Sequence, residues 1–211
     1  MVGVAESCKV IRLRLALFGG TFDPIHDAHL TVAREAASQF SLERVLFVPA
    51  AHPPHKVDSL GATYEDRYAM VELACAIDPR FEASRLEDGS GPSYSIDTVE
   101  KVRGQAQDLF FIIGADAFAE ITTWHRWREL MELTQFIVVT RPGHGGYQNP
   151  DGARVHRLDT LALPVSSSDI RQKLLEGRVP EELPEAVAEY IQARGLYQWS
   201  KAAEINVGAA E

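Results

Sequence analysis

Strand-like and helix-like segments alternate along this chain, and that alternation is the feature that most constrains its fold. The stretch IRLRLALF (11–18) alternates apolar and polar residues as a strand does, and RVLFVPA (44–50) is rich in valine and phenylalanine. Between them, AHLTVAREAASQF (28–40) places its apolar residues at helical spacing. A strand, a helix and a strand in this order predict a βαβ unit.

Further helix patterns follow along the chain. The stretch 63–77, TYEDRYAMVELACAI, is amphipathic, and Thr63 with Asp66 three residues later is an aspartate variant of a capping box. The stretch 96–104, IDTVEKVRG, has the same period, and Ser95 is placed to cap it. We therefore expect helices over both stretches.

Three more stretches have strand character. RFEAS (80–84) predicts a short strand, whereas DLFFIIGA (108–115) and QFIVVT (135–140) are continuous apolar runs, typical of parallel strands covered on both faces. The expected fold is therefore α/β: a Rossmann-like, doubly wound, mostly parallel sheet with helices on both faces. Ligands of such sheets bind outside the carboxyl ends of the strands, where the strand order reverses.

The length of 211 residues favours one domain over two, and we assign residues 1–200 to a single domain. The Gly/Pro-rich stretch 142–153 is expected to be a surface loop, because further elements that need the same core follow it. Residues 201–211 show no apolar period and are expected to form a flexible tail.

Composition excludes several classes of protein. A formal net charge of −9 and a pI of about 5.3 argue against non-specific binding to nucleic acid or to an anionic membrane. No apolar stretch has the length needed to cross a bilayer. Cys8 and Cys75 lie far apart and form no C-x-x-C pair, so a reducing, cytoplasmic location is expected.

The stretch GGTFDPIHDAHL (19–30) lies where the first predicted strand gives way to a helix. Gly19 and Gly20 permit either a close approach of a ligand or a positive φ, and Pro24 fixes the chain before the helix. The N–H groups at the start of that helix suit a phosphate. His26 and His29 share one face of its first turn and could donate hydrogen bonds to phosphate oxygens.

The histidine pair has two other interpretations. Histidines at i and i+3 could bind zinc, but no cysteine, glutamate or third histidine accompanies them at ligand spacing. They could also be ordinary capping and surface residues, as most H-x-x-H pairs are. The spacing by itself does not choose between these readings.

The whole string, however, resembles the G-x-F-x-P-x-H/T-x-G-H signature of the nucleotidylyltransferase superfamily. A second stretch, VSSSDIR (165–171), resembles the I-S-S-T-x-I-R element of the same superfamily. Its serines begin a predicted helix and Arg171 follows one turn later, although a Ser-x-x-Asp sequence is also simply a good helix start. The glycine of H-x-G-H is Ala28 here, which places one extra methyl group at the site.

The middle of the chain is similar to one branch of this superfamily, the nicotinate-nucleotide adenylyltransferases. With the two end motifs the similarity runs from about residue 15 to residue 171. The stretches that carry it are PPHK (53–56), PSYSIDT (92–98), IIGAD (112–116) and WHRWREL (124–130).

This resemblance implies a set of site residues. The implied catalytic residues are His26, His29, Lys56 and Arg171. Those implied to bind ATP are Gly19, Gly20, Thr21, Phe22, His26, His29, Gly114, Asp116, Ser167, Ser168 and Arg171. Nicotinate mononucleotide would be bound by Lys56, Ser95, Trp124 and His125, with Trp124 stacking on the pyridine ring. Trp127 is expected to pack in the core instead.

The implied reaction is adenylyl transfer from ATP to nicotinate mononucleotide, giving nicotinate adenine dinucleotide and pyrophosphate in NAD biosynthesis. Mg²⁺ would be held mainly by the phosphates of ATP, so no metal-ligand motif in the protein is expected. The alternatives are nicotinamide-mononucleotide, phosphopantetheine or glycerol-3-phosphate nucleotidylyltransferases, or a non-catalytic nucleotide-binding module. Whether the chain forms a homo-oligomer stays open.

Overall fold

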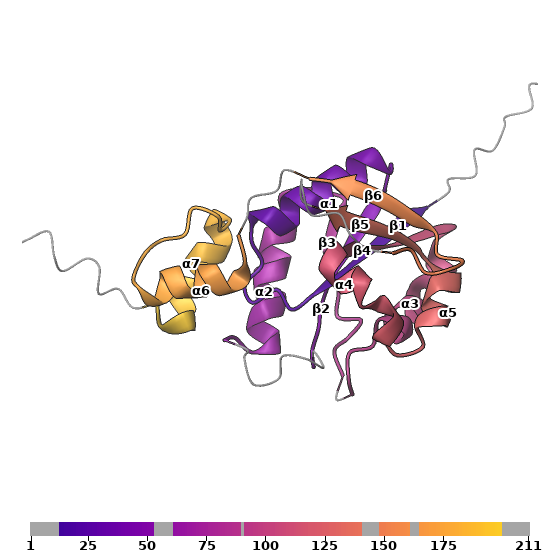
Figure 1. Cartoon of the computed structure of the whole chain (residues 1–211). Helices are drawn as coiled ribbons and strands as arrows, with labels where there is room; N and C mark the ends of the chain where they lie inside the picture. The colour runs from indigo at the N-terminus through magenta and orange to yellow at the C-terminus, as the bar shows by residue number, and fades with distance from the viewer. Residues whose placement is uncertain (1–12, 53–60, 90, 141–147, 161–164, 200–211) are drawn as a thin grey trace, which may run out of the picture.

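A computed structural model of the chain describes residues 13–52, 61–89, 91–140, 148–160 and 165–199. In order along the chain (Figure 1), the strands and helices are β1 (Arg14–Gly20), α1 (Asp27–Gln39), β2 (Arg44–Pro49), α2 (Tyr64–Cys75), β3 (Phe81–Ala83), α3 (Ser95–Val102), η2 (Arg103–Gln105), β4 (Asp108–Gly114), α4 (Ala115–Ala119), η3 (Ile121–Thr123), α5 (Trp127–Leu133), β5 (Gln135–Thr140), β6 (Val155–Asp159), α6 (Ser167–Leu175), α7 (Glu185–Arg194) and η4 (Leu196–Gln198). The three η elements are short 3₁₀ helices.

The strands form one six-stranded sheet in the order β3-β2-β1-β4-β5-β6. Every neighbouring pair is parallel, so the expected doubly wound α/β architecture is confirmed. Because β1 pairs with both β2 and β4, the order reverses beside β1. A site is therefore expected at the carboxyl ends of β1 and β4.

Two apolar cores cover the two faces of the sheet. Successive residues of a strand point to opposite faces, and in β1 Ala16 belongs to one core while Leu15 and Leu17 belong to the other. Buried residues of α1, α2, α6 and α7 fill the first core, and those of α3, α4 and α5 fill the second. Figure 1 shows α1 and α2 on the opposite side of the sheet from α3 and α5.

Most of the expected elements lie where the sequence pattern places them, with shifts at their ends. Thr63 caps α2 as expected, since its Oγ1 accepts the N–H of Asp66 at 3.2 Å. Ser95 is not the cap of α3, because it is already the first helical residue and Tyr94 precedes it as N-cap. Of the expected surface loop, residues 148–153 form no helix or strand.

Packing against Phe22 gives a structural reason for the glycine at position 20, and it replaces the expected positive φ, while the expected close approach of a ligand stays a prediction. Neither Gly19 nor Gly20 has a positive φ. A Cβ at Gly20 would lie 2.9 Å from the ring of Phe22, and that ring is only 2% exposed. Phe22 itself has a φ of 50°, a left-handed conformation that non-glycine residues seldom adopt. The missing side chain at Gly20 thus makes room for Phe22 in the core.

We expect Gly20→Ala to lower the free energy of unfolding by about 1–3 kcal/mol, because the added methyl group overpacks the core against Phe22. Urea unfolding followed by circular dichroism measures this. The matched control is Gly104→Ala, since a Cβ there meets nothing within 4 Å. Equal stability of the two variants would contradict the packing role of Gly20.

Candidate active site

The two motif histidines lie together at the start of α1. His26 is the N-cap of this helix, and His29 lies in its first turn. Their rings stack with centroids 3.8 Å apart and planes inclined by 29°. The backbone N–H of His26 donates to Nδ1 of His29 at 3.3 Å. Because Nδ1 is an acceptor here, the proton of a neutral His29 sits on Nε2, which leaves that nitrogen as a donor.

Both imidazoles are uncharged near neutral pH. Burial lowers the pKa of His26 to about 4, against a smaller opposing effect of the Glu182 carboxylate. Burial also lowers the pKa of His29 well below its usual value, and the neighbouring His26 lowers it further. The ring of His29 packs edge-on against the buried Phe22 ring, with centroids 5.1 Å apart. The pair therefore offers neutral N–H donors.

A cleft of about 570 Å³ opens beside these histidines. It brings together the start of α1, the end of β4 and the start of α6, three segments that are far apart in the sequence. Its lining consists of Phe18, His26, Ala28, His29, Val32, Gly114, Ala115, Asp116, Val139, Thr160, Val165, Ser166 and Ser167. The two sequence motifs thus meet in one site, at the reversal of strand order.

The serine motif begins α6, as its sequence predicts. Ser166 Oγ accepts the N–H of Asp169 at 3.2 Å, and the Asp169 carboxylate accepts the N–H of Ser166 at 3.1 Å, which completes a capping box. Ser167 Oγ donates to the carbonyl oxygen of Pro24 at 3.0 Å. Ser168 Oγ accepts from Nη2 of Arg171 at 3.3 Å. All three hydroxyls thus have partners within the chain.

Three residues predicted to bind ATP make structural contacts in or against the loop that carries the histidine motif. Arg171 does not line the cleft, and its Nη1 donates to the carbonyl oxygen of Asp23 at 2.7 Å. The carbonyl oxygen of Thr21 accepts from Nη1 of the buried Arg67 at 2.7 Å. Phe22 is a core residue, as described above. In this structure these contacts fix the backbone from Thr21 to Asp23.

Three residues predicted to bind nicotinate mononucleotide, Ser95, Trp124 and His125, do not line this cleft. The ring of His125 stacks on Tyr94 with centroids 4.4 Å apart, which brings Trp124 and His125 beside the start of α3 at Ser95. Trp124 packs edge-on against Phe111. It precedes α5, which begins at Trp127. Trp127 packs against the core as expected, and Lys56 lies outside the described residues.

Sequence reasoning missed three residues that support the site. Asp23 lies inside the first motif, between two residues that the motif specifies, and this position was the only signal for it. Arg67 and Tyr197 come from α2 and η4, and both make hydrogen bonds to the loop before α1. No local pattern marks either residue, since their partners lie far along the chain.

We expect the buried histidines to make the free energy of unfolding depend on pH. The unfolded chain, with histidine pKa values near 6.5, binds more protons than the folded chain down to about pH 4, so stability falls as the pH falls through this window. Urea unfolding of wild type and His29→Gln at pH 7 and pH 5 measures the effect. The loss of stability is expected to be smaller in His29→Gln, and an equal loss would contradict burial of a neutral His29.

A comparison with known families identifies the class of this protein. The family model described as cytidylyltransferase-like matches residues 17–173, a range that contains both cleft motifs. The chain therefore belongs to the cytidylyltransferase-like family. Among the described residues, no helix is long and apolar enough to cross a membrane.

Its relatives narrow the class further. A probable nicotinate-nucleotide adenylyltransferase of Solibacter usitatus is 55% identical over 188 residues, covering 88% of this chain and 100% of that protein. Another, of Thermus thermophilus, is 46% identical over 190 residues, covering 88% of this chain and 100% of that protein. Within its class the chain thus falls among the nicotinate-nucleotide adenylyltransferases, which are nucleotidyltransferases, and the resemblance seen in the motifs is confirmed.

A solved structure supports the same fold. The nicotinic acid mononucleotide adenylyltransferase of Plasmodium falciparum, determined in complex with NaAD, matches with a TM-score of 0.73. The match covers 89% of this chain and 98% of that one, at 18% sequence identity. At this identity the match shows the shared fold.

Proposed function

We propose that this protein transfers the adenylyl group of ATP to nicotinate mononucleotide, releasing pyrophosphate and nicotinate adenine dinucleotide. The observation that carries the proposal is the single cleft in which the first turns of α1 and α6 meet beside the end of β4. The identity with nicotinate-nucleotide adenylyltransferases over almost the whole chain supports the choice of acceptor.

ATP would occupy the cleft beside His26 and His29. The first turns of α1 and α6 both line it, and the positive dipole ends of these helices suit the phosphates. Gly114 and Asp116 line the part of the cleft that follows β4, where the Asp116 carboxylate would accept hydrogen bonds from the ribose hydroxyls. The apolar part of the lining, which includes Val32 and Val139, suits a nucleobase.

Nicotinate mononucleotide would lie toward α3 and η3. Trp124 is half-buried and offers a flat ring for stacking on the pyridine. The backbone N–H groups near Ser95 and His125 would hold the nicotinate carboxylate without a cationic side chain. Its 5′-phosphate would then point toward the histidine pair, and Lys56 stays a predicted ligand of this substrate.

The reaction needs positioning more than covalent chemistry. An oxygen of the 5′-phosphate of nicotinate mononucleotide attacks the α-phosphorus of ATP, a new P–O bond forms, and the bond from the α-phosphorus to the bridging oxygen breaks. That oxygen leaves with pyrophosphate and takes the electron pair. His26 and His29 would donate N–H groups to phosphoryl oxygens as their negative charge grows, so these hydrogen bonds strengthen in the transition state.

Mg²⁺ fits this site as an ion carried by the substrate. Among the described residues no group of three histidine, cysteine, aspartate or glutamate side chains could hold a metal, and Asp116 is the one carboxylate on the cleft lining. When bound, Mg²⁺ would neutralise charge on the pyrophosphate leaving group. Of the two predicted ligands of the β- and γ-phosphates, Arg171 is bonded to the carbonyl oxygen of Asp23 outside the cleft lining, so Lys56 stays the predicted ligand of the remaining charge.

We expect rapid pyrophosphate release from ATP and Mg²⁺ with nicotinate mononucleotide. Release is expected to be much slower with nicotinamide mononucleotide, phosphopantetheine, or CTP plus glycerol-3-phosphate. A coupled phosphate assay with each pair measures this. A preference for another acceptor would keep the fold and overturn the acceptor, and ATP binding without any release would support a non-catalytic module.

Histidine variants provide the internal control for this assay. His26→Ala and His29→Ala should each lower kcat by about 100-fold or more, because each removes a donor that acts in the transition state. His156→Ala is the matched control, since His156 lies on β6 and bonds to Gln135 away from the cleft. Unchanged turnover in either motif variant would remove that residue from the proposed mechanism.

We expect Trp124→Ala to raise the KM for nicotinate mononucleotide about tenfold or more while the KM for ATP changes little, because a stacked ring is lost on one substrate only. Steady-state kinetics with each substrate varied in turn measures this. Trp127→Phe serves as the control for a tryptophan that packs on the same core. A parallel rise of both KM values would contradict the stacking role.

A further inference from the structure

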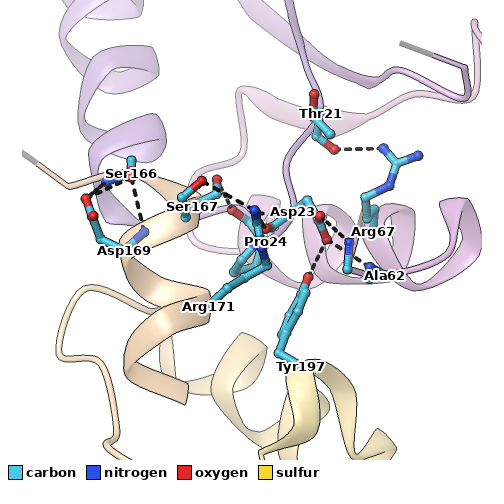
Figure 2. Close-up of polar contacts among 12 residues, drawn as sticks. Thr21, Asp23, Pro24, Ala62, Arg67, Ser166, Ser167, Asp169, Arg171 and Tyr197 are labelled. Atoms are coloured by element: carbon cyan, nitrogen blue, oxygen red, sulfur yellow. Dashed lines mark hydrogen bonds and ion pairs between the residues drawn. The ribbon is translucent and has the colours of Figure 1, made fainter. Parts of the chain in front are cut away.

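Asp23 is a buried carboxylate at the centre of the loop that carries the histidine motif. Its side chain is 3% exposed. Oδ2 accepts the N–H of Gly61 at 2.8 Å, and Oδ1 accepts the N–H of Ala62 at 3.1 Å. Figure 2 shows contacts converging on Asp23 from Ala62, which precedes α2, on one side and from Tyr197 on the other. The carboxylate thus joins the loop to a distant part of the chain.

Tyr197 supplies a further contact to this carboxylate. Its hydroxyl donates to Oδ1 of Asp23 at 2.8 Å, across 174 positions of sequence (Figure 2). Burial raises the pKa of Tyr197, and the negative charge of Asp23 raises it further, so the hydroxyl stays protonated and donates. The hydroxyl is therefore a donor to this carboxylate at neutral pH.

The ring of Tyr197 packs in the space that the absent side chain of Gly61 leaves. A Cβ at Gly61 would lie 2.7 Å from Cε1 of Tyr197 and 3.0 Å from Cδ of Arg171, so the glycine makes room for both side chains. Tyr197 has a φ of 57° and Gln198 likewise, which is an uncommon conformation for residues with side chains. Such a backbone conformation persists where surrounding contacts fix it, and here the packing of the ring and the hydrogen bond of the hydroxyl do so.

The same loop is held at two carbonyl oxygens. Arg67 donates to the carbonyl of Thr21, and Arg171 donates to that of Asp23, each at 2.7 Å. Nη1 of Arg171 is also 3.6 Å from the Asp23 carboxylate. His26, the N-cap of α1, follows Asp23 by three residues. The position of the Asp23 side chain therefore sets where both the histidine pair and Arg171 lie.

We propose that Tyr197 is a positioning residue for adenylyl transfer, acting through Asp23 on the loop that presents His26 and His29 to the cleft. Tyr197 lies beyond residue 173, where the cytidylyltransferase-like match ends, so this role belongs to a segment outside that match. The inference rests on the proposed function for its kinetic test, although its structural test does not.

The expected kinetic signature follows from where the histidines act. Their hydrogen bonds strengthen as charge develops, so a small displacement of the loop weakens the transition state more than the bound substrates. A residue that only stabilised the fold would lower the melting temperature and leave the turnover of folded molecules unchanged. A fall in kcat at constant KM distinguishes the two roles.

The experiment compares Tyr197→Phe with wild type at a temperature where both are folded. We expect kcat to fall about tenfold, with both KM values within about twofold. Tyr190→Phe is the matched control, because its hydroxyl donates to the Asp66 carboxylate at 3.0 Å and not to the loop. This control should keep the wild-type kcat. A kcat for Tyr197→Phe within twofold of wild type overturns the proposal.

Asp23→Asn and the double variant Asp23→Asn/Tyr197→Phe test the route through Asp23. If Tyr197 acts through this carboxylate, the double variant has the kcat of Asp23→Asn alone. Independent, multiplied losses overturn the route. If Asp23→Asn does not fold, the comparison of Tyr197→Phe with Tyr190→Phe still decides the proposal.

A second measurement separates failure of this inference from failure of the proposed function. Amide hydrogen exchange followed by mass spectrometry reports on residues 21–30 without any turnover. We expect faster exchange there in Tyr197→Phe than in wild type or Tyr190→Phe. Unchanged exchange overturns the positioning role, whatever the acceptor. An inactive wild type with faster exchange in the variant overturns the proposed function alone.

Discussion

The point where β1 and β4 stop pairing is the constraint on which the site depends. Their ladder ends at Phe18 and Ile112, whereas β1 continues with β2 to Gly20 and β4 continues with β5 to Gly114. The two central strands therefore part at their carboxyl ends, and the chain after each turns to a different face of the sheet. The cleft lies in this opening, with α1 on one side and the segment after β4 on the other.

The two arginines near this opening form hydrogen bonds to the backbone. Arg67 and Arg171 both donate to carbonyl oxygens of the histidine loop, and no arginine or lysine lines the described part of the cleft. The imidazoles are neutral at pH 7 because burial lowers their pKa values. Anion binding would then rest on oriented N–H dipoles, which need little reorganisation as charge moves along the reacting phosphates.

The sequence predicts the elements well and their assembly only in part. Periodicity locates β2, β5 and α2 nearly to the residue because it records local geometry and burial. The order of strands and the meeting of the two motifs depend on pairing between distant segments. The packing of Gly20 against Phe22 could not be predicted because it depends on where that ring lies in the fold, and the bond from Tyr197 to Asp23 leaves no periodic pattern at either end.

The pair α6 and α7 links the stability of the C-terminal segments to the geometry of the cleft. Figure 1 shows the two helices beside α2, away from the strands of the sheet. They contact the start of α1 through the N–H of Asp27, which donates to the carbonyl of Glu182 at 2.9 Å, and through Ser167, which bonds to Pro24. Displacing these helices would therefore remove two contacts that hold the start of α1, from which both histidines come.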